Sequence, residues 1–108
     1  MKLSIGRLAA RQIRSIYAYI AHDNHQAAAK VVARIDEVAK FIAANPGAGR
    51  ATLDPDVRAF PVNPYPYVIY FRNLRDEVRI VRVLHAEQRR PELREEGPAY
   101  LAEFAQTR

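Results

Sequence analysis

The sequence predicts an α+β fold in which an N-terminal strand and an antiparallel helical hairpin pack on a small antiparallel β-sheet, followed by a short C-terminal helix. In the first half of the 108-residue chain, apolar residues recur every three or four positions, as in amphipathic helices. In the second half, short runs rich in Val, Ile, Tyr and Phe alternate with turn residues, which is typical of strands. The length indicates a single domain over residues 1–108, with a core over 1–90 and a tail over 91–108.

The first segment, from Lys2 to Ile5, is expected to form a short strand that leads into a helix. The apolar positions that follow have helical spacing and define one stripe, which is Ala9, Ile13, Ile16, Tyr17 and Ile20. Asp23-Asn24 then offers a helix N-cap, and Gln26 stands three residues after Asp23 as in a capping box. A second helix is therefore predicted to begin directly after this turn.

The second helix is predicted from a longer apolar stripe, which is Ala28, Val31, Val32, Ile35, Val38, Ala39 and Ile42. It should end near Asn45, because Pro46 and Gly47 do not favour continuation of a helix. Only about four residues join the two helices, a short connection, so the helices must lie antiparallel.

Three strands are predicted after a loop that extends from Pro46 to Pro55. Their ranges are Val57 to Asn63, Tyr67 to Arg72 and Val78 to His85, with turn-forming residues between them. The short connections favour an antiparallel meander. Pro61 marks the first strand as an edge strand, because proline has no N–H to donate to a ladder. The short C-terminal helix is expected to begin at Pro98.

The predicted strands carry apolar residues on both faces. The run Tyr67 to Phe71 is continuously apolar or aromatic, and Ile80, Val81, Val83 and Leu84 load both faces of the last strand. Antiparallel strands with one hydrated face would instead alternate apolar and polar residues. The helical hairpin can cover only one face, so the other requires the tail or another chain.

Composition excludes several kinds of site. The chain has no cysteine, which excludes a disulfide framework, a thiolate zinc site, an iron–sulfur cluster and a cysteine nucleophile. No run approaches the roughly 20 apolar residues that a membrane span needs. The histidines of the turn from His22 to His25 are more typical of a solvated cap than of a metal site. We therefore expect no metal and no cofactor.

The charge is basic and consists mainly of arginine. The chain has 17 basic and 12 acidic residues, a formal net charge of +5, and only three of the basic residues are lysine. Arginine is preferred where a planar fork must bind carboxylate or phosphate groups. An acidic partner, either a nucleic acid or a protein, is therefore expected.

Several basic side chains lie on or beside the predicted strands. They are Arg58, Arg72, Arg79, Arg82, His85, Arg89 and Arg90. Strict alternation would place Arg82 on the same face as Ile80 and Leu84. Arg79 and His85 would then share the other face.

Two alternatives remain open for these basic side chains. The arginines either form internal ion pairs with Glu77, Glu87 or an acidic residue of the tail, or line a surface that receives an acidic segment or RNA phosphate. His85, at the end of the last strand, could act beside them as a general acid or base, or merely as an orienting hydrogen-bond partner.

Six short sequence pieces stand in a characteristic order along the chain. They are Tyr19-Ile20-Ala21, Asn45-Pro-Gly, Gly49-Arg50, Arg58-x-Phe60-x-Val62, Tyr67-Val-Ile-Tyr70 and Val81-Arg-Val-Leu-His85. Together with the order of the predicted elements, they resemble the ParE/RelE superfamily of type II toxin–antitoxin toxins over about residues 3–90. The final Val-Leu-His is closer to the ParE, or plasmid-stabilisation, branch.

The resemblance implies a toxin that inhibits growth. Members of the ParE branch poison DNA gyrase by trapping it on cleaved DNA and are not known as enzymes, whereas members of the RelE branch cleave mRNA on the ribosome. No lysine follows Lys40, which departs from the RelE pattern. A metal-free endoribonuclease using Arg58, Arg82 and His85 is the alternative. A non-toxic binding module of the same fold is a third possibility.

The resemblance also implies a partner, a cognate antitoxin with an acidic segment that wraps around the toxin in the bacterial cytoplasm. Such a segment would meet the need to cover the second face of the strands. The residues expected to contact the target or the antitoxin are Arg50, Arg58, Tyr70, Arg72, Arg79, Arg82, His85 and Arg89.

Overall fold

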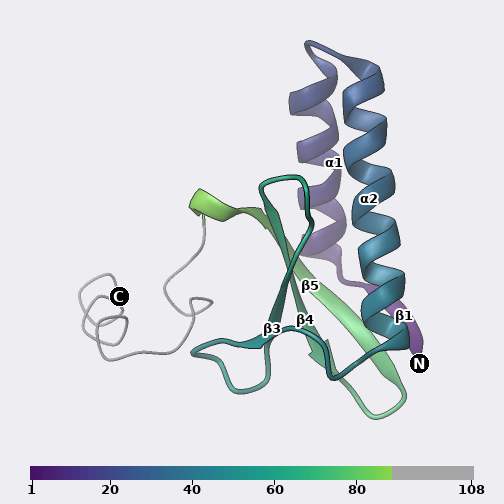
Figure 1. Ribbon diagram of the computed structural model, residues 1–108, viewed down its shortest axis with the longest axis vertical. Helices are drawn as coiled ribbons and strands as arrows, with labels where there is room; N and C mark the ends of the chain where they lie inside the picture. Colours follow the sequence, from purple (N-terminus) through teal and green to yellow (C-terminus); the bar gives the residue numbers. More distant parts are fainter. Residues whose placement is uncertain (89–108) are drawn as a thin grey trace.

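The computed structural model describes residues 1–88, which form two antiparallel helices on one face of a five-stranded sheet (Figure 1). The helices are α1 (Arg7–Ala21) and α2 (His25–Ala44), and a 3₁₀-helix, η1 (Ala86–Gln88), follows the last strand. The strands are β1 (Lys2–Ile5), β2 (Arg50–Ala51), β3 (Arg58–Pro61), β4 (Tyr67–Asn73) and β5 (Glu77–His85). The predicted α+β fold is confirmed, whereas the tail over 91–108 and its helix from Pro98 lie outside the described residues.

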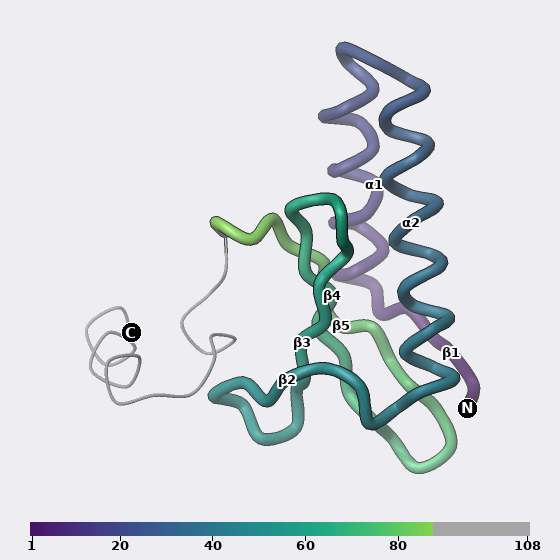
Figure 2. Tube along the Cα trace, in the orientation of Figure 1, coloured from purple at the N-terminus to yellow at the C-terminus, as the bar shows by residue number. Residues whose placement is uncertain are grey.

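The sheet has the strand order β1-β5-β4-β3-β2 and is mixed rather than purely antiparallel. β1 pairs in parallel with β5, and the other neighbours are antiparallel. The predicted meander corresponds to β3, β4 and β5. The sequence did not indicate β2, which lies within the predicted loop and has only two residues (Figure 2). The prediction from Pro61 of an edge strand was wrong for β3, because β2 pairs beside it. Pro61 itself lies beyond the two residues of β3 that pair with β2, so its missing N–H leaves no bond of that ladder unmade.

The helix α1 packs on the core through Ala9, which is fully buried, and through the half-buried Ile13, Ile16 and Ile20. Tyr17 was predicted to belong to this stripe, but its side chain is 39% exposed. The last turns of α1 extend beyond the edge of the sheet (Figure 1), so fewer partners are present to bury a side chain there. The predicted stripe is therefore correct except at Tyr17.

The helix α2 begins and ends close to its predicted limits. Its N-cap is Asn24, whose side chain accepts a hydrogen bond of 3.0 Å from the N–H of Ala27. The predicted capping box of Asp23 with Gln26 was wrong by one residue, because Asn24 is the cap and Ala27 stands three positions after it. The helix stops before Asn45, as predicted from the proline and glycine that follow.

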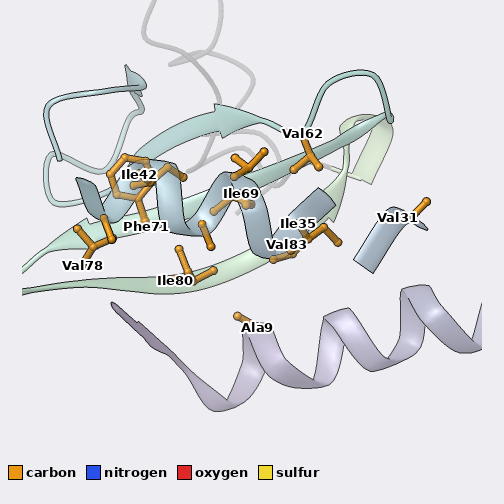
Figure 3. Close-up of a cluster of buried hydrophobic side chains, with 13 residues drawn as sticks. Ala9, Val31, Ile35, Ile42, Val62, Ile69, Phe71, Val78, Ile80 and Val83 are labelled. Carbon is orange, nitrogen blue, oxygen red and sulfur yellow. The ribbon is translucent and has the colours of Figure 1, made fainter. Parts of the chain in front are cut away.

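The main core lies between α2 and the sheet (Figure 3). Its members from α2 are Val31, Ile35, Val38, Ala39, Ile42 and Ala43, and those from the second half of the chain are Val62, Ile69, Phe71, Val78, Ile80 and Val83. Each large aliphatic or aromatic side chain that is fully buried contributes about 1.5–3 kcal/mol to folding. One face of the sheet is therefore closed by the hairpin, and a second, smaller group of buried residues lies on the opposite face.

Candidate functional site

A β-bulge in β5 decides which side chains lie on each face of the sheet. Tyr70 of β4 pairs with Arg82, whereas the next residue, Phe71, pairs with Ile80. Val81 is therefore an extra residue in β5. An extra residue reverses the alternation of the side chains that follow it.

This bulge makes the prediction from strict alternation wrong. Ile80 lies in the core beneath the helices, but Arg82 and Leu84 lie on the opposite face. Arg79 and His85 were predicted to share a face, yet Arg79 lies on the face without helices and His85 lies on the helix-covered face beside Tyr67. The consequence for the site is that Arg79 and Arg82 are brought onto one surface.

Gln12 of α1 holds the bulged segment of β5 in place. Its side-chain Oε1 accepts a hydrogen bond of 2.8 Å from the backbone N–H of Val83, two residues after Val81. A buried N–H without an acceptor costs about 1–3 kcal/mol. Gln12 is thus a positioning residue that the sequence analysis missed. The available signal was a polar residue at the border of the apolar stripe of α1.

The sheet face opposite the helices, called the second face below, combines an apolar centre with basic side chains around it. Buried there are Val57, Ala59, Val68 and Tyr70, with Val81 and Leu84 packed against them. The strand register places Arg82 beside Tyr70, Arg50 beside Ala59, and Arg72 beside Arg79. We call Arg50, Arg72, Arg79 and Arg82 the arginine rim. The structure therefore unites five of the predicted contact residues, counting Tyr70, on one face.

The members of the arginine rim differ in their partners. The guanidinium of Arg79 lies 3.3 Å from the carboxylate of Glu77, and that of Arg72 lies 3.4 Å from Asp56. The guanidinium of Arg82 makes no hydrogen bond or ion pair with any residue in the part of the chain that the structure describes. The internal ion pair considered as an alternative thus exists for Arg79 with Glu77. For Arg82, a pair with an acidic residue of the tail and a contact with an external anion both stay predictions, because the tail lies outside the described residues.

Glu77 connects β1 to β5 through its carboxylate. It accepts a hydrogen bond from the hydroxyl of Ser4 and pairs with Arg79. The Ser4 hydrogen bond, followed by the charges of Arg79 and Lys2, lowers the pKa of the Glu77 carboxyl. Because the folded pKa lies below the unfolded value of about 4.3, the ionised carboxylate stabilises the fold above that pH. This stabilisation is lost as the pH falls through the folded pKa.

We expect Glu77→Gln to be less stable than the wild type at pH 7, with a difference that shrinks below about pH 4 as the wild-type carboxylate is protonated. Urea denaturation followed by circular dichroism between pH 3 and 7 measures the difference in the free energy of unfolding between the two proteins. Glu87→Gln is the control, because the exposed Glu87 carboxylate makes no hydrogen bond within residues 1–88. A difference between Glu77→Gln and wild type that is the same at every pH would contradict the role of the charge.

Arg58 does not belong to the second face. It pairs with Phe71, whose side chain lies in the helix-covered core. Its guanidinium donates hydrogen bonds to three backbone carbonyls of the loop after α2, from Nε to Ala48 at 3.1 Å and from Nη2 to Gly49 at 2.6 Å and Gly47 at 3.4 Å. These bonds hold the loop against β3. A role of Arg58 in target binding stays a prediction.

His85 lies at a cleft of about 560 Å³ between α1 and the end of the sheet. The cleft is lined by Ser15, Ile16, Tyr19, Tyr67, His85 and Glu87. The Nδ1 atom of His85 accepts a hydrogen bond of 3.1 Å from the N–H of Glu87, and its ring meets Tyr67 edge-on with centroids 5.5 Å apart. Burial, and next the nearby Tyr19, raises the pKa of the Tyr67 hydroxyl. The imidazole is therefore oriented by the backbone and by an aromatic neighbour.

The three side chains of the ribonuclease alternative do not form a common site. Arg58 pairs with Phe71 and His85 pairs with Tyr67, so they stand four residues apart along β4, or about 13 Å. Arg82 lies on the opposite face of the sheet from both. Proton transfer requires its groups within about 3 Å of the reacting atoms. The arrangement therefore does not favour histidine-assisted cleavage.

Other parts of the predicted site concern residues beyond the sheet. Arg89 lies outside the described residues. Among residues 1–88, no three His, Asp or Glu side chains lie close enough together to hold a metal ion. In the same range, neither helix is both long and apolar enough to cross a membrane.

Comparison with known proteins identifies the family. Residues 3–90 match the family described as "ParE toxin of type II toxin-antitoxin system, parDE". The chain belongs to the ParE toxin family. The ParE-type chain is 39% identical over 85 residues to "Putative toxin Y4kP" of Sinorhizobium fredii (strain NBRC 101917 / NGR234), covering 79% of this chain and 88% of that relative.

A solved structure supports the same assignment. It is described as "Chromosomal ParDE TA system from P. aeruginosa", and the ParE-type chain is similar to it with a TM-score of 0.70 and 33% identity. The similarity covers 79% of this chain and 95% of the other. The resemblance to the ParE branch drawn from sequence is therefore confirmed, and so is a ParE-type toxin of a type II toxin–antitoxin system.

Proposed function

We propose that this ParE-type toxin inhibits bacterial growth by poisoning DNA gyrase and that a cognate antitoxin neutralises it. The observation that supports a protein target is the second face, where the arginine rim lies beside the partly exposed Val81 and Leu84. Arginine is enriched at protein interfaces and among the residues that supply most of their binding energy. The gyrase target itself follows from the resemblance to the ParE branch.

The antitoxin is proposed to cover the second face with an acidic, partly apolar segment. The similar structure from P. aeruginosa is described as a ParDE toxin–antitoxin system, which supports such a partner for this chain. The charge of Arg82 and the partly exposed apolar side chains of Val81 and Leu84 match a segment of that composition. Occupation of this face by the antitoxin would block the target, which explains neutralisation.

The deciding experiment adds the purified full chain to a gyrase supercoiling and DNA-cleavage assay and, in parallel, to a translating ribosome system with mapping of mRNA ends. We expect cleaved DNA–gyrase complexes that an excess of the antitoxin suppresses. Cut message without cleaved DNA would replace the proposal by the ribonuclease alternative. Inactivity in both assays, with antitoxin binding retained, would indicate a non-toxic binding module.

Arg82→Ala is expected to weaken gyrase inhibition by about thirtyfold, because loss of a charged contact at an interface costs about 2 kcal/mol or more. Its stability should stay within about 0.5 kcal/mol of wild type, since the guanidinium has no partner in residues 1–88. The matched control is Arg75→Ala, which removes an exposed arginine from the turn between β4 and β5. Equal inhibition by both variants would contradict a role for the arginine rim.

A further inference from the structure

The outer surface of α1 carries three arginines that no residue in the range 1–88 neutralises. Arg7, Arg11 and Arg14, called the α1 stripe below, are exposed and lie within an arc of about 60° on the helix. They point away from Ala9 and Ile16, which pack on the core. Their guanidinium groups make no hydrogen bond or ion pair with other described residues. The stripe is therefore a concentrated and accessible positive charge.

This arrangement opposes the stability of its own helix. Arg7 stands in the first turn of α1, where the helix dipole favours acidic residues, and neither an acidic residue in the first turn nor a basic residue in the last turn compensates. Like charges four residues apart also repel each other. In α2, by contrast, Lys40 pairs with Asp36 at 2.9 Å and Arg34 with Glu37 at 3.6 Å. Because the charges of the α1 stripe are unfavourable for the helix that carries them, we infer that they bind an anion outside residues 1–88.

We propose that the α1 stripe binds the phosphate backbone of duplex DNA. The side chains next to it, Ala10, Ser15 and Ala18, are small and provide no large apolar anchor of the kind that a bound peptide needs. The exposed Tyr17 and Tyr19 of the same helix lie about 90° or more around the helix from the centre of the stripe. A flat row of cations beside small side chains instead suits phosphate contacts. The stripe is about 10 Å long, over which one DNA strand presents about three phosphates.

The position of the stripe is compatible with simultaneous binding of a protein. The helices lie on one side of the sheet (Figure 1), and the strand register places the arginine rim on the other, so a protein on the second face leaves the α1 stripe open. The choice of duplex DNA among polyanions rests on the proposed function, because a gyrase poison works beside the DNA that gyrase holds. The stripe would then add a contact to that DNA.

The test measures binding of the full chain to a short fluorescent DNA duplex by anisotropy over a series of salt concentrations. Loss of three phosphate contacts should make the slope of log K against log salt shallower by about 2.7. The test variant carries Arg7→Gln, Arg11→Gln and Arg14→Gln. The matched control removes the same charge from exposed positions elsewhere through Lys2→Gln, Lys30→Gln and Arg75→Gln, and it should keep most of the wild-type slope. Replacing the three stripe arginines by lysine should also retain the slope.

Several results would overturn the proposal. These are an equal loss of slope in the test and control variants, wild-type binding by the test variant, or stripe-dependent binding that favours an RNA hairpin or polyglutamate over duplex DNA. Thermal unfolding of each variant confirms that the fold is intact. If the wild type fails to poison gyrase but shows stripe-dependent DNA binding, the proposed function fails and this inference stands. If the wild type poisons gyrase while the test variant binds DNA normally, the proposed function stands and this inference fails.

Discussion

Replacing Gly49 by alanine is expected to lower the free energy of unfolding by about 3 kcal/mol, a large part of the stability of a small domain. Gly49 has φ +91°, in the region that L side chains rarely adopt. An added Cβ would stand 2.7 Å from the carbonyl oxygen of Ala59 and 3.2 Å from the Phe71 ring. The oxygen cannot move away freely, because Ala59 pairs with both Arg50 and Tyr70 in the sheet. Urea denaturation followed by circular dichroism measures the loss.

The same loop provides a matched control. An added Cβ at Gly47 meets no atom within 4 Å, and Gly47 does not have a positive φ. Gly47→Ala should therefore change the stability by no more than about 0.5 kcal/mol. If both variants unfolded at the wild-type urea concentration, the close approach of the loop to β3 would be wrong. This approach matters for the site because it positions β2, which carries Arg50 of the arginine rim.

Arg58→Ala is expected to destabilise the fold by about 2–3 kcal/mol. Hydrogen bonds from a charged donor contribute about 1.5–3 kcal/mol each, but part of this is regained here when water hydrates the exposed loop. The substitution removes the bonds to Gly47, Ala48 and Gly49, of which the shortest is 2.6 Å. Arg58→Lys should be nearly as unfavourable, because an ammonium cannot reproduce the planar fork. The measurement is the midpoint of urea or thermal unfolding.

Arg82→Ala is the comparison for this prediction, because it removes the same side chain from the same sheet. It should leave unfolding unchanged and weaken inhibition, whereas Arg58→Ala should lower stability first. If Arg58→Ala kept wild-type stability and lost toxicity, Arg58 would instead be a binding residue, as the sequence analysis expected. The pair of variants thus separates an arginine that supports the fold from one that meets a partner.

The helices were predictable because their signals are local. The end of α2 at Asn45 follows from the Pro and Gly beside it, and the buried positions of α2 follow from helical spacing over 20 residues. The start of α2 was predicted correctly, but the cap itself was left between Asp23 and Asn24, because both residue types are good caps. Only the geometry that directs the side chain of Asn24 to the N–H of Ala27 distinguishes them.

The candidate site was only partly predictable. The basic residues of the predicted strands indicated Arg72, Arg79 and Arg82, and the resemblance to the family added Arg50 and Tyr70. The structure places all five on the second face. Their common face was not predictable, because strict alternation separated Arg79 from Arg82. The hydrogen bonds of Arg58 to the loop after α2 were not predictable either, because alternation along a strand says nothing about contacts with a loop.

The sequence by itself determined the α+β class, the helical hairpin, the strands of the meander and a ParE-type identity, because periodicity, turn residues and short motifs depend on neighbours along the chain. Tertiary structure alone decided three features, which are the parallel pairing of β1 with β5, the bulge at Val81, and the contacts of Gln12 and Arg58. Each joins segments distant in sequence or depends on one extra residue in a strand. These features depend on tertiary packing, since the buried faces of all strands must match across the whole sheet.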